Sequence, residues 1–129
     1  TCDNDPVISG CSASYDGNFE YLYHGASWND NIRIQYGIDY VPGNNYEWQA
    51  ATSASSNTNF TYYAYLNNID ATATVDYYAD NSYLTTLDQD TAPAGWSPLG
   101  MIYNDNQHYV RVNAGFIGNT AADAIMVEW

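Results

Sequence analysis

Lysine is absent from this 129-residue sequence, and Arg33 and Arg111 are its only arginines. Fifteen acidic residues leave a formal net charge of −13 at pH 7. Nucleic acids and anionic membrane surfaces are bound through basic patches, so we expect neither as a partner. The acidity is typical of a soluble extracellular protein, and it leaves cations and neutral polymers as ligand classes.

Long apolar runs are also lacking. No stretch is long enough for a signal peptide or a membrane-spanning helix, so no membrane insertion is expected. We interpret the sequence as the mature form of a secreted, extracellular protein whose leader has been removed.

Cysteine is scarce, with Cys2 and Cys11 as the two examples. Their spacing matches no zinc-binding pattern. We predict a disulfide that closes a short N-terminal loop in an oxidising compartment and stabilises the fold by about 2–3 kcal/mol. A bridge between subunits is the alternative.

Tyrosine is abundant, with 14 residues, and apolar and polar residues alternate in short runs without helical periodicity. Clusters of Asn, Asp, Gly and Pro separate the runs. We predict an all-β fold, a two-sheet antiparallel β-sandwich of jelly-roll-like form with eight or nine short strands. Residues 1–12 form a disulfide-clipped N-terminal segment, and 13–129 form a single domain. The alternating runs are 19–23, 32–36, 46–50, 60–66, 73–78, 83–88, 99–103, 109–112 and 124–129.

The last third of the sequence has a recognisable order. A Gly95-Trp96-Ser97-Pro98 turn leads into a strand, a second alternating strand spans 108–112, and Ala122-Asp123-Ala124 precedes a final apolar strand. This order resembles the golvesin-type domain, also called the xanthan-lyase carbohydrate-binding-like domain. The resemblance implies a small extracellular β-sandwich without catalytic activity. It also implies a structural role for Asp123, whose carboxylate would accept backbone N–H groups at the entry to the last strand.

The number of aromatic residues exceeds what one core could bury. Adjacent pairs such as Tyr62-Tyr63 must place one ring on each face of a strand, so several rings should lie outside the core. A large exposed aromatic patch is typical of a contact surface. The candidate residues for ligand or subunit contact are Tyr23, Trp28, Tyr63, Tyr65 and Tyr78.

Three other patterns point to chemistry. Asn59-Phe60-Thr61 is a sequon, which makes Asn59 a candidate N-glycosylation site. Asp3 and Asp5 are candidate ligands of a structural Ca²⁺, and the turns at 29–31 and 104–106 carry similar oxygen-rich side chains. No other cofactor is expected.

No catalytic residues are predicted. A serine nucleophile needs a histidine base, and neither His24 nor His108 lies in a nucleophile motif. The many carboxylates show no pairing motif of the kind that glycosidases use.

Two functions are therefore open. The first is a structural or adhesive subunit that associates with itself into a fibre or matrix, which the lack of edge-protecting lysine favours. The second is a carbohydrate-binding module that recognises polysaccharide through surface Tyr and Trp. We favour the first, because carbohydrate-binding modules normally accompany a catalytic domain.

Overall fold

The computed structural model describes the backbone of residues 2–4, 13–16, 19–23, 32–34, 45–51, 57–66, 71–113, 118, 120–122 and 124–129. It describes side chains for 47–48, 57–66, 71–113, 118, 120–122 and 125–129. Asp5, Cys11, Trp28 and Asp123, which the sequence singled out, lie outside the described residues. The disulfide and the role of Asp123 therefore stay predictions.

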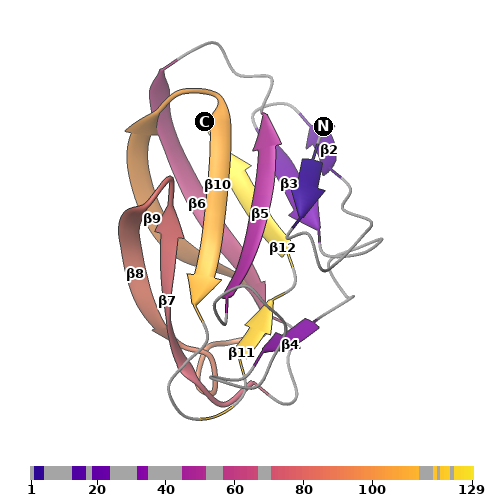
Figure 1. Ribbon diagram of the computed structural model, residues 1–129, viewed down its shortest axis with the longest axis vertical. Helices are drawn as coiled ribbons and strands as arrows, with labels where there is room; N and C mark the ends of the chain where they lie inside the picture. Colours follow the sequence, from indigo (N-terminus) through magenta and orange to yellow (C-terminus); the bar gives the residue numbers. More distant parts are fainter. Residues whose placement is uncertain are drawn as a thin grey trace.

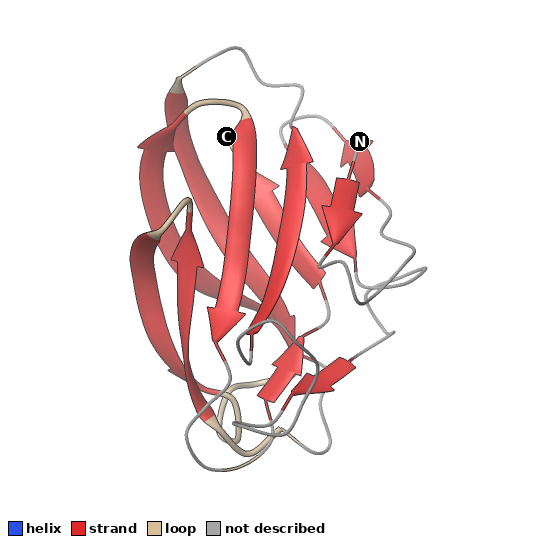
Figure 2. Ribbon diagram, in the orientation of Figure 1, coloured by secondary structure: helices blue, strands red, loops and turns tan. Residues whose placement is uncertain are grey.

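Antiparallel strands make up the secondary structure of this part of the chain, and no helix occurs in it (Figure 2). Two five-stranded sheets and one two-stranded sheet are formed (Figure 1). Sheet A has the order β1-β5-β10-β7-β8, from β1 (Cys2–Asn4), β5 (Asn45–Ala51), β10 (Gln107–Asn113), β7 (Thr74–Ala79) and β8 (Ser82–Asp88). Sheet B has the order β2-β3-β12-β6-β9, from β2 (Ala13–Asp16), β3 (Phe19–Tyr23), β12 (Ala124–Glu128), β6 (Thr58–Leu66) and β9 (Gly95–Asn104). The small sheet pairs β4 (Ile32–Ile34) with β11 (Thr120–Ala122).

The predicted all-β class is confirmed, but the predicted number of strands is wrong. The described residues form twelve strands, and each of the nine alternating runs overlaps one of them. The additional strands are β1, β2 and β11, which have three or four residues each. Alternation cannot be recognised over so few residues, because it needs at least four to eight.

Alternation correctly predicts which face of β6, β7 and β10 is buried. In β6, Tyr62 is fully buried while Tyr63 is half-buried, and in β7 the same holds for Tyr77 and Tyr78. Each adjacent tyrosine pair thus places one ring in the core and one outside it, as the period of two requires.

One buried cluster draws its residues from both five-stranded sheets. Sheet A contributes Trp48, Val75, Tyr77, Ala79, Val110 and Val112, and sheet B contributes Phe60, Tyr62, Ala64, Leu99, Ile125 and Val127. The Tyr62 hydroxyl lies 2.8 Å from Nδ1 of His108, which joins β6 to β10. The Phe60 ring meets the His108 imidazole edge-on, with 4.5 Å between ring centroids. Burial raises the pKa of the Tyr62 hydroxyl, so this hydroxyl keeps its proton.

Gln89 holds the end of the β7–β8 hairpin against β11. Its side chain is 1% exposed, and its Nε2 donates to the Tyr77 hydroxyl at 2.9 Å and to the Ala121 carbonyl at 3.0 Å. Its Oε1 accepts from the Ala121 N–H at 2.8 Å. Because the amide has the same donor and acceptor groups as a peptide, Gln89 satisfies both backbone groups of Ala121 at once.

The sheet edges formed by β8 and β9 are irregular. The pairing register shifts between Tyr77 and Tyr78 where β7 meets β8, and between Tyr62 and Tyr63 where β6 meets β9. Strand β9 also contains Pro98, which has no N–H to donate to a further strand. Bulges and proline are devices that prevent edge-to-edge addition.

Gly118→Ala is expected to lower the free energy of unfolding by about 2 kcal/mol or more. Gly118 has φ +92°, and an added Cβ would lie 2.6 Å from Thr72 Oγ1 and 3.1 Å from the Thr72 carbonyl. The matched control is Gly95→Ala, where φ is +111° but no atom lies within 4 Å of the added Cβ. Urea denaturation measures both variants, and equal losses would show that the contact with Thr72 costs nothing.

Candidate functional site

The side of sheet B that faces away from the buried cluster carries aromatic and apolar side chains, of which Met126 is buried and Tyr63, Tyr65 and Trp96 are half-buried. We define the aromatic face as Tyr63 and Tyr65 of β6, Trp96, Pro98, Met101 and Tyr103 of β9, and Met126 and Glu128 of β12. Cross-strand pairing aligns Tyr65 with Trp96, Tyr63 with both Pro98 and Met126, and Asn59 with Tyr103. Directly opposed residues lie on the same side of a sheet, so these side chains form one continuous surface.

The aromatic face contains large exposed groups at the β9 edge. Tyr103 is 70% exposed and Met101 is 61% exposed. Further in, the Tyr65 and Trp96 rings meet edge-on with 5.1 Å between centroids. Such contacts hold the rings in place, which lowers the entropy lost when a partner covers them.

The charge on this face is low. Among the described side chains of the aromatic face, Glu128 is the one acidic residue. Its Oε1 accepts a 2.9 Å hydrogen bond from the Tyr63 hydroxyl. The same hydrogen bond raises the pKa of Tyr63. The face is therefore nearly uncharged in a protein of net charge −13.

Strand β3 extends the surface by register. Tyr23 lies opposite Ala124, which lies opposite Tyr65, and Tyr21 lies opposite Met126. Three of the predicted contact residues, Tyr23, Tyr63 and Tyr65, thus belong to the two strands of sheet B that flank β12.

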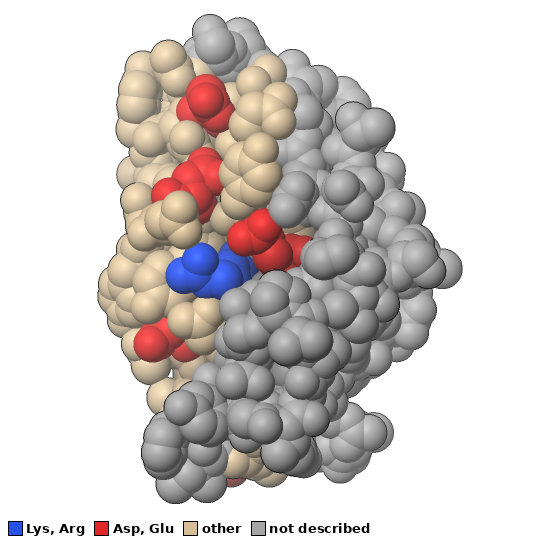
Figure 3. Space-filling view, viewed as in Figure 1, with Lys and Arg blue, Asp and Glu red and all other residues tan. Residues whose placement is uncertain are grey.

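Tyr78, another predicted contact residue, belongs to sheet A. The Arg111 guanidinium lies over its ring at 4.5 Å, and the Tyr83 ring meets it edge-on at 5.9 Å. The exposed side of sheet A carries the tyrosines Tyr83 and Tyr109 together with charged groups, and Figure 3 shows acidic side chains at several places on it with a basic side chain among them. The two sheets therefore present exposed faces of different character.

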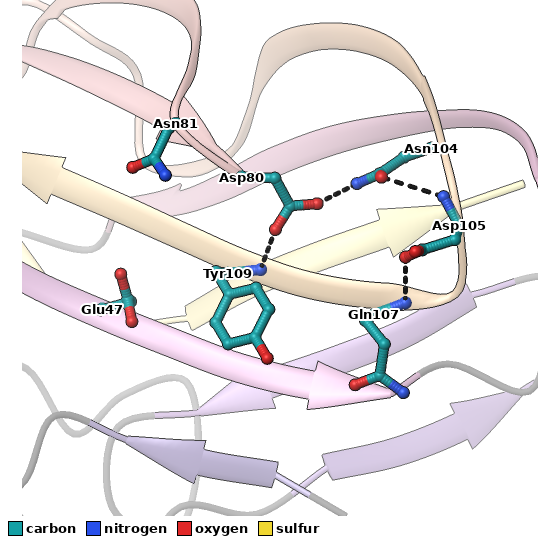
Figure 4. A pocket seen from close by; sticks show the side chains of 7 residues that line it. All are labelled: Glu47, Asp80, Asn81, Asn104, Asp105, Gln107 and Tyr109. Atoms are coloured by element: carbon teal, nitrogen blue, oxygen red, sulfur yellow. Dashed lines mark hydrogen bonds between the residues drawn. The ribbon is translucent and has the colours of Figure 1, made fainter.

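A second candidate site lies at the β7–β8 turn of sheet A and at the turn that connects β9 of sheet B to β10 of sheet A. It is a polar pocket of about 430 Å³ (Figure 4). We define the polar pocket by its lining residues, which are Glu47, Asp80, Asn81, Asn104, Asp105, Gln107 and Tyr109. The residues come from β5, from the turn between β7 and β8, and from the end of β9, the start of β10 and the turn that joins them.

Hydrogen bonds fix the walls of the polar pocket. Asp80 accepts from the Tyr109 backbone N–H at 3.0 Å and from the Asn104 amide. Asn104 in turn accepts from the Asp105 N–H at 2.9 Å, and Asp105 accepts from the Gln107 N–H at 2.9 Å. Burial raises the pKa of Asp80, and these two donors partly offset the rise.

Sequence reasoning missed the polar pocket. Its parts are two turns that are distant in the sequence, and only the fold brings them together. One local signal was available in the sequence, because the turn-forming pair Asp80-Asn81 stands between two alternating runs. In the structure these two residues have φ values of 48° and 65°, as a two-residue hairpin turn requires.

The remaining predicted sites are placed as follows. Asn59 is exposed on β6, opposite Tyr103, so a glycan there would project from the aromatic face. Asp3 lies in β1, opposite Gln49, and its side chain is not among those described. Within the described residues, no three His, Cys, Asp or Glu side chains come together as a metal ion would need.

Comparison of the chain with family models, with curated proteins and with solved structures finds no match. In the part of the chain that the structure describes, no helix is long and apolar enough to span a membrane.

Proposed function

We propose that this protein is a non-catalytic, secreted structural subunit that associates with further copies of itself through the aromatic face. In this proposal, sheets A and B form a jelly-roll-like β-sandwich, and the golvesin-type resemblance accounts for its extracellular setting. The disulfide between Cys2 and Cys11 belongs to the same proposal.

The observation that carries the proposal is the exposure of Met101 and Tyr103 on a sheet face that also carries the rings of Tyr63, Tyr65 and Trp96. Soluble monomers rarely expose a contiguous apolar surface of this kind, and one that is exposed usually contacts a partner. Tyrosine and methionine are also enriched in protein interfaces.

Electrostatics favours a second copy at this face. Two molecules of charge −13 repel each other, and the repulsion is weakest where each surface has few charges. Pairing through the aromatic face would also turn the acidic exposed sides of sheet A away from each other. The aromatic face is also favoured over the β8 and β9 edges, which are blunted by register shifts and by Pro98.

Growth beyond a pair needs a second contact. A face that pairs with itself gives a two-fold dimer, whereas a fibre requires head-to-tail contacts. The association into a fibre or matrix that the sequence predicts would therefore combine the aromatic face with another surface.

The position of His108 argues against its use as a catalytic base, as the proposal of a non-catalytic subunit requires. This side chain is 0% exposed and lies against Phe60 and Tyr62 in the core, so it cannot reach a substrate as a general base.

The double substitution Met101→Lys with Tyr103→Lys is expected to weaken self-association at least about tenfold, because it places two charges in the interface. Both side chains are exposed, so the fold should be kept. The matched control is Tyr83→Lys, which changes a 57% exposed tyrosine on sheet A. Sedimentation velocity of the three proteins at equal concentration is the measurement. Equal association of the double variant and the wild type would exclude the aromatic face as the interface.

A second candidate function, polysaccharide recognition, is favoured by a specific observation, the polar pocket on sheet A. The polar pocket is lined by residues other than the surface aromatics that the sequence suggested.

A further inference from the structure

The polar pocket contains side-chain groups that the fold does not use. Within the described part of the chain, neither the Gln107 amide nor the Tyr109 hydroxyl makes a hydrogen bond, and Tyr109 is 45% exposed. Figure 4 shows the Tyr109 ring between the side chains of Glu47 and Gln107. A ring and a primary amide without internal partners are thus presented together in one concave site.

We propose that the polar pocket binds a sugar unit of a neutral polysaccharide. The Tyr109 ring serves as the surface on which the apolar face of a pyranose stacks. The amides of Gln107 and Asn81 bind the hydroxyl groups around it.

The chemistry of the lining selects this ligand class. Sugar hydroxyls both donate and accept hydrogen bonds, and the pocket offers both kinds of group, since amides donate and accept while carboxylates accept. Acidic sugars and phosphates are disfavoured by the carboxylates of Glu47, Asp80 and Asp105. An apolar ligand would leave the Gln107 amide without a partner.

The pocket is also pre-organised. Asp80 joins the β7–β8 turn to β10 through the Tyr109 N–H, and Arg111 donates from Nη1 to Asn81 Oδ1 at 3.2 Å. The latter contact orients the Asn81 amide so that its NH₂ group stays available. Pre-organised walls reduce the entropy lost on binding, which matters most for a weakly bound sugar.

The test titrates the full chain, labelled with ¹⁵N, with neutral hexasaccharides of glucose, xylose, mannose and N-acetylglucosamine. A galacturonic acid hexamer and a glucosamine hexamer represent the anionic and cationic classes. We expect at least one neutral hexamer to shift the backbone amide signals of Asn81, Gln107 and Tyr109.

Tyr109→Ala is expected to weaken this binding about tenfold, which corresponds to the loss of one stacking contact. Tyr109→Phe keeps the ring and is expected to retain most of the affinity. Tyr103→Ala is the matched control, because it removes an exposed tyrosine from sheet B, and it should leave sugar binding unchanged. Its effect on association tests the proposed function separately, so either proposal can fail alone.

Three results would overturn the inference. The first is the absence of shifts with every neutral hexamer. The second is binding that Tyr109→Ala and Tyr103→Ala weaken equally. The third is binding of the glucosamine hexamer alone that is lost on adding salt, which would show simple attraction of a cation to an acidic surface.

Discussion

Gln89→Leu is expected to lower the free energy of unfolding by about 3–5 kcal/mol, a large share of the stability of a small domain. The substitution keeps the side-chain size but removes three hydrogen bonds, from the Tyr77 hydroxyl and from the N–H and carbonyl of Ala121. All these groups are buried, so water cannot replace the amide.

The matched control for this prediction is Gln107→Leu, which makes the same chemical change at an exposed position and should alter stability by less than about 0.5 kcal/mol. Urea denaturation followed by far-UV circular dichroism measures both. A loss of under about 1 kcal/mol for Gln89→Leu would mean that Ala121 and Tyr77 find other partners.

Acidification from pH 6.5 to pH 4 is expected to remove about 3 kcal/mol of stability through His108 alone. Burial lowers the pKa of His108 to about 4 in the folded protein, and the nearby charge of Asp105 opposes this only in part. The unfolded chain takes up the proton near pH 6.5, while the folded protein does not do so until about pH 4. The stabilisation is therefore complete above pH 6.5 and is lost as the pH falls towards 4.

The contribution of His108 can be separated from that of other titrating groups. In the double variant Tyr62→Phe with His108→Phe, both hydrogen-bonding partners become apolar, so neither is left unpaired. The difference in unfolding free energy between the wild type and this variant should depend on pH between 6.5 and 4 and be constant above 7. A difference that is constant over the whole range would contradict the lowered pKa.

The long strands could be predicted from the sequence, because their side chains alternate strictly. Phe60, Tyr62, Ala64 and Leu66 alternate with polar or tyrosine neighbours, and all four are buried in β6. The presence of rings on both faces followed from adjacent tyrosines. This pattern requires only that a strand repeats every two residues, so no tertiary information was needed.

The sites could be predicted only in part, because they depend on which strands become neighbours. Tyr63 and Tyr65 were identified, but the exposure of Met101 and Tyr103 depends on β9 lying at the edge of sheet B. Gln89 was missed because a buried glutamine carries no periodic signal.

The two exposed faces have separate roles in this account. The aromatic face is nearly uncharged and suits association, while the polar pocket lies on sheet A and would stay open in the assembled form. Association would place several pockets on one particle, and multiple weak sites bind a polymer more tightly than one.

Sedimentation velocity of the wild-type chain, over a wide concentration range and at low and high salt, tests the central claim most directly. We expect species larger than the monomer that increase with concentration. They should increase further with salt, because salt screens the repulsion between molecules of charge −13 while apolar contact persists. A chain that stays monomeric at every concentration and salt level would contradict association through the aromatic face.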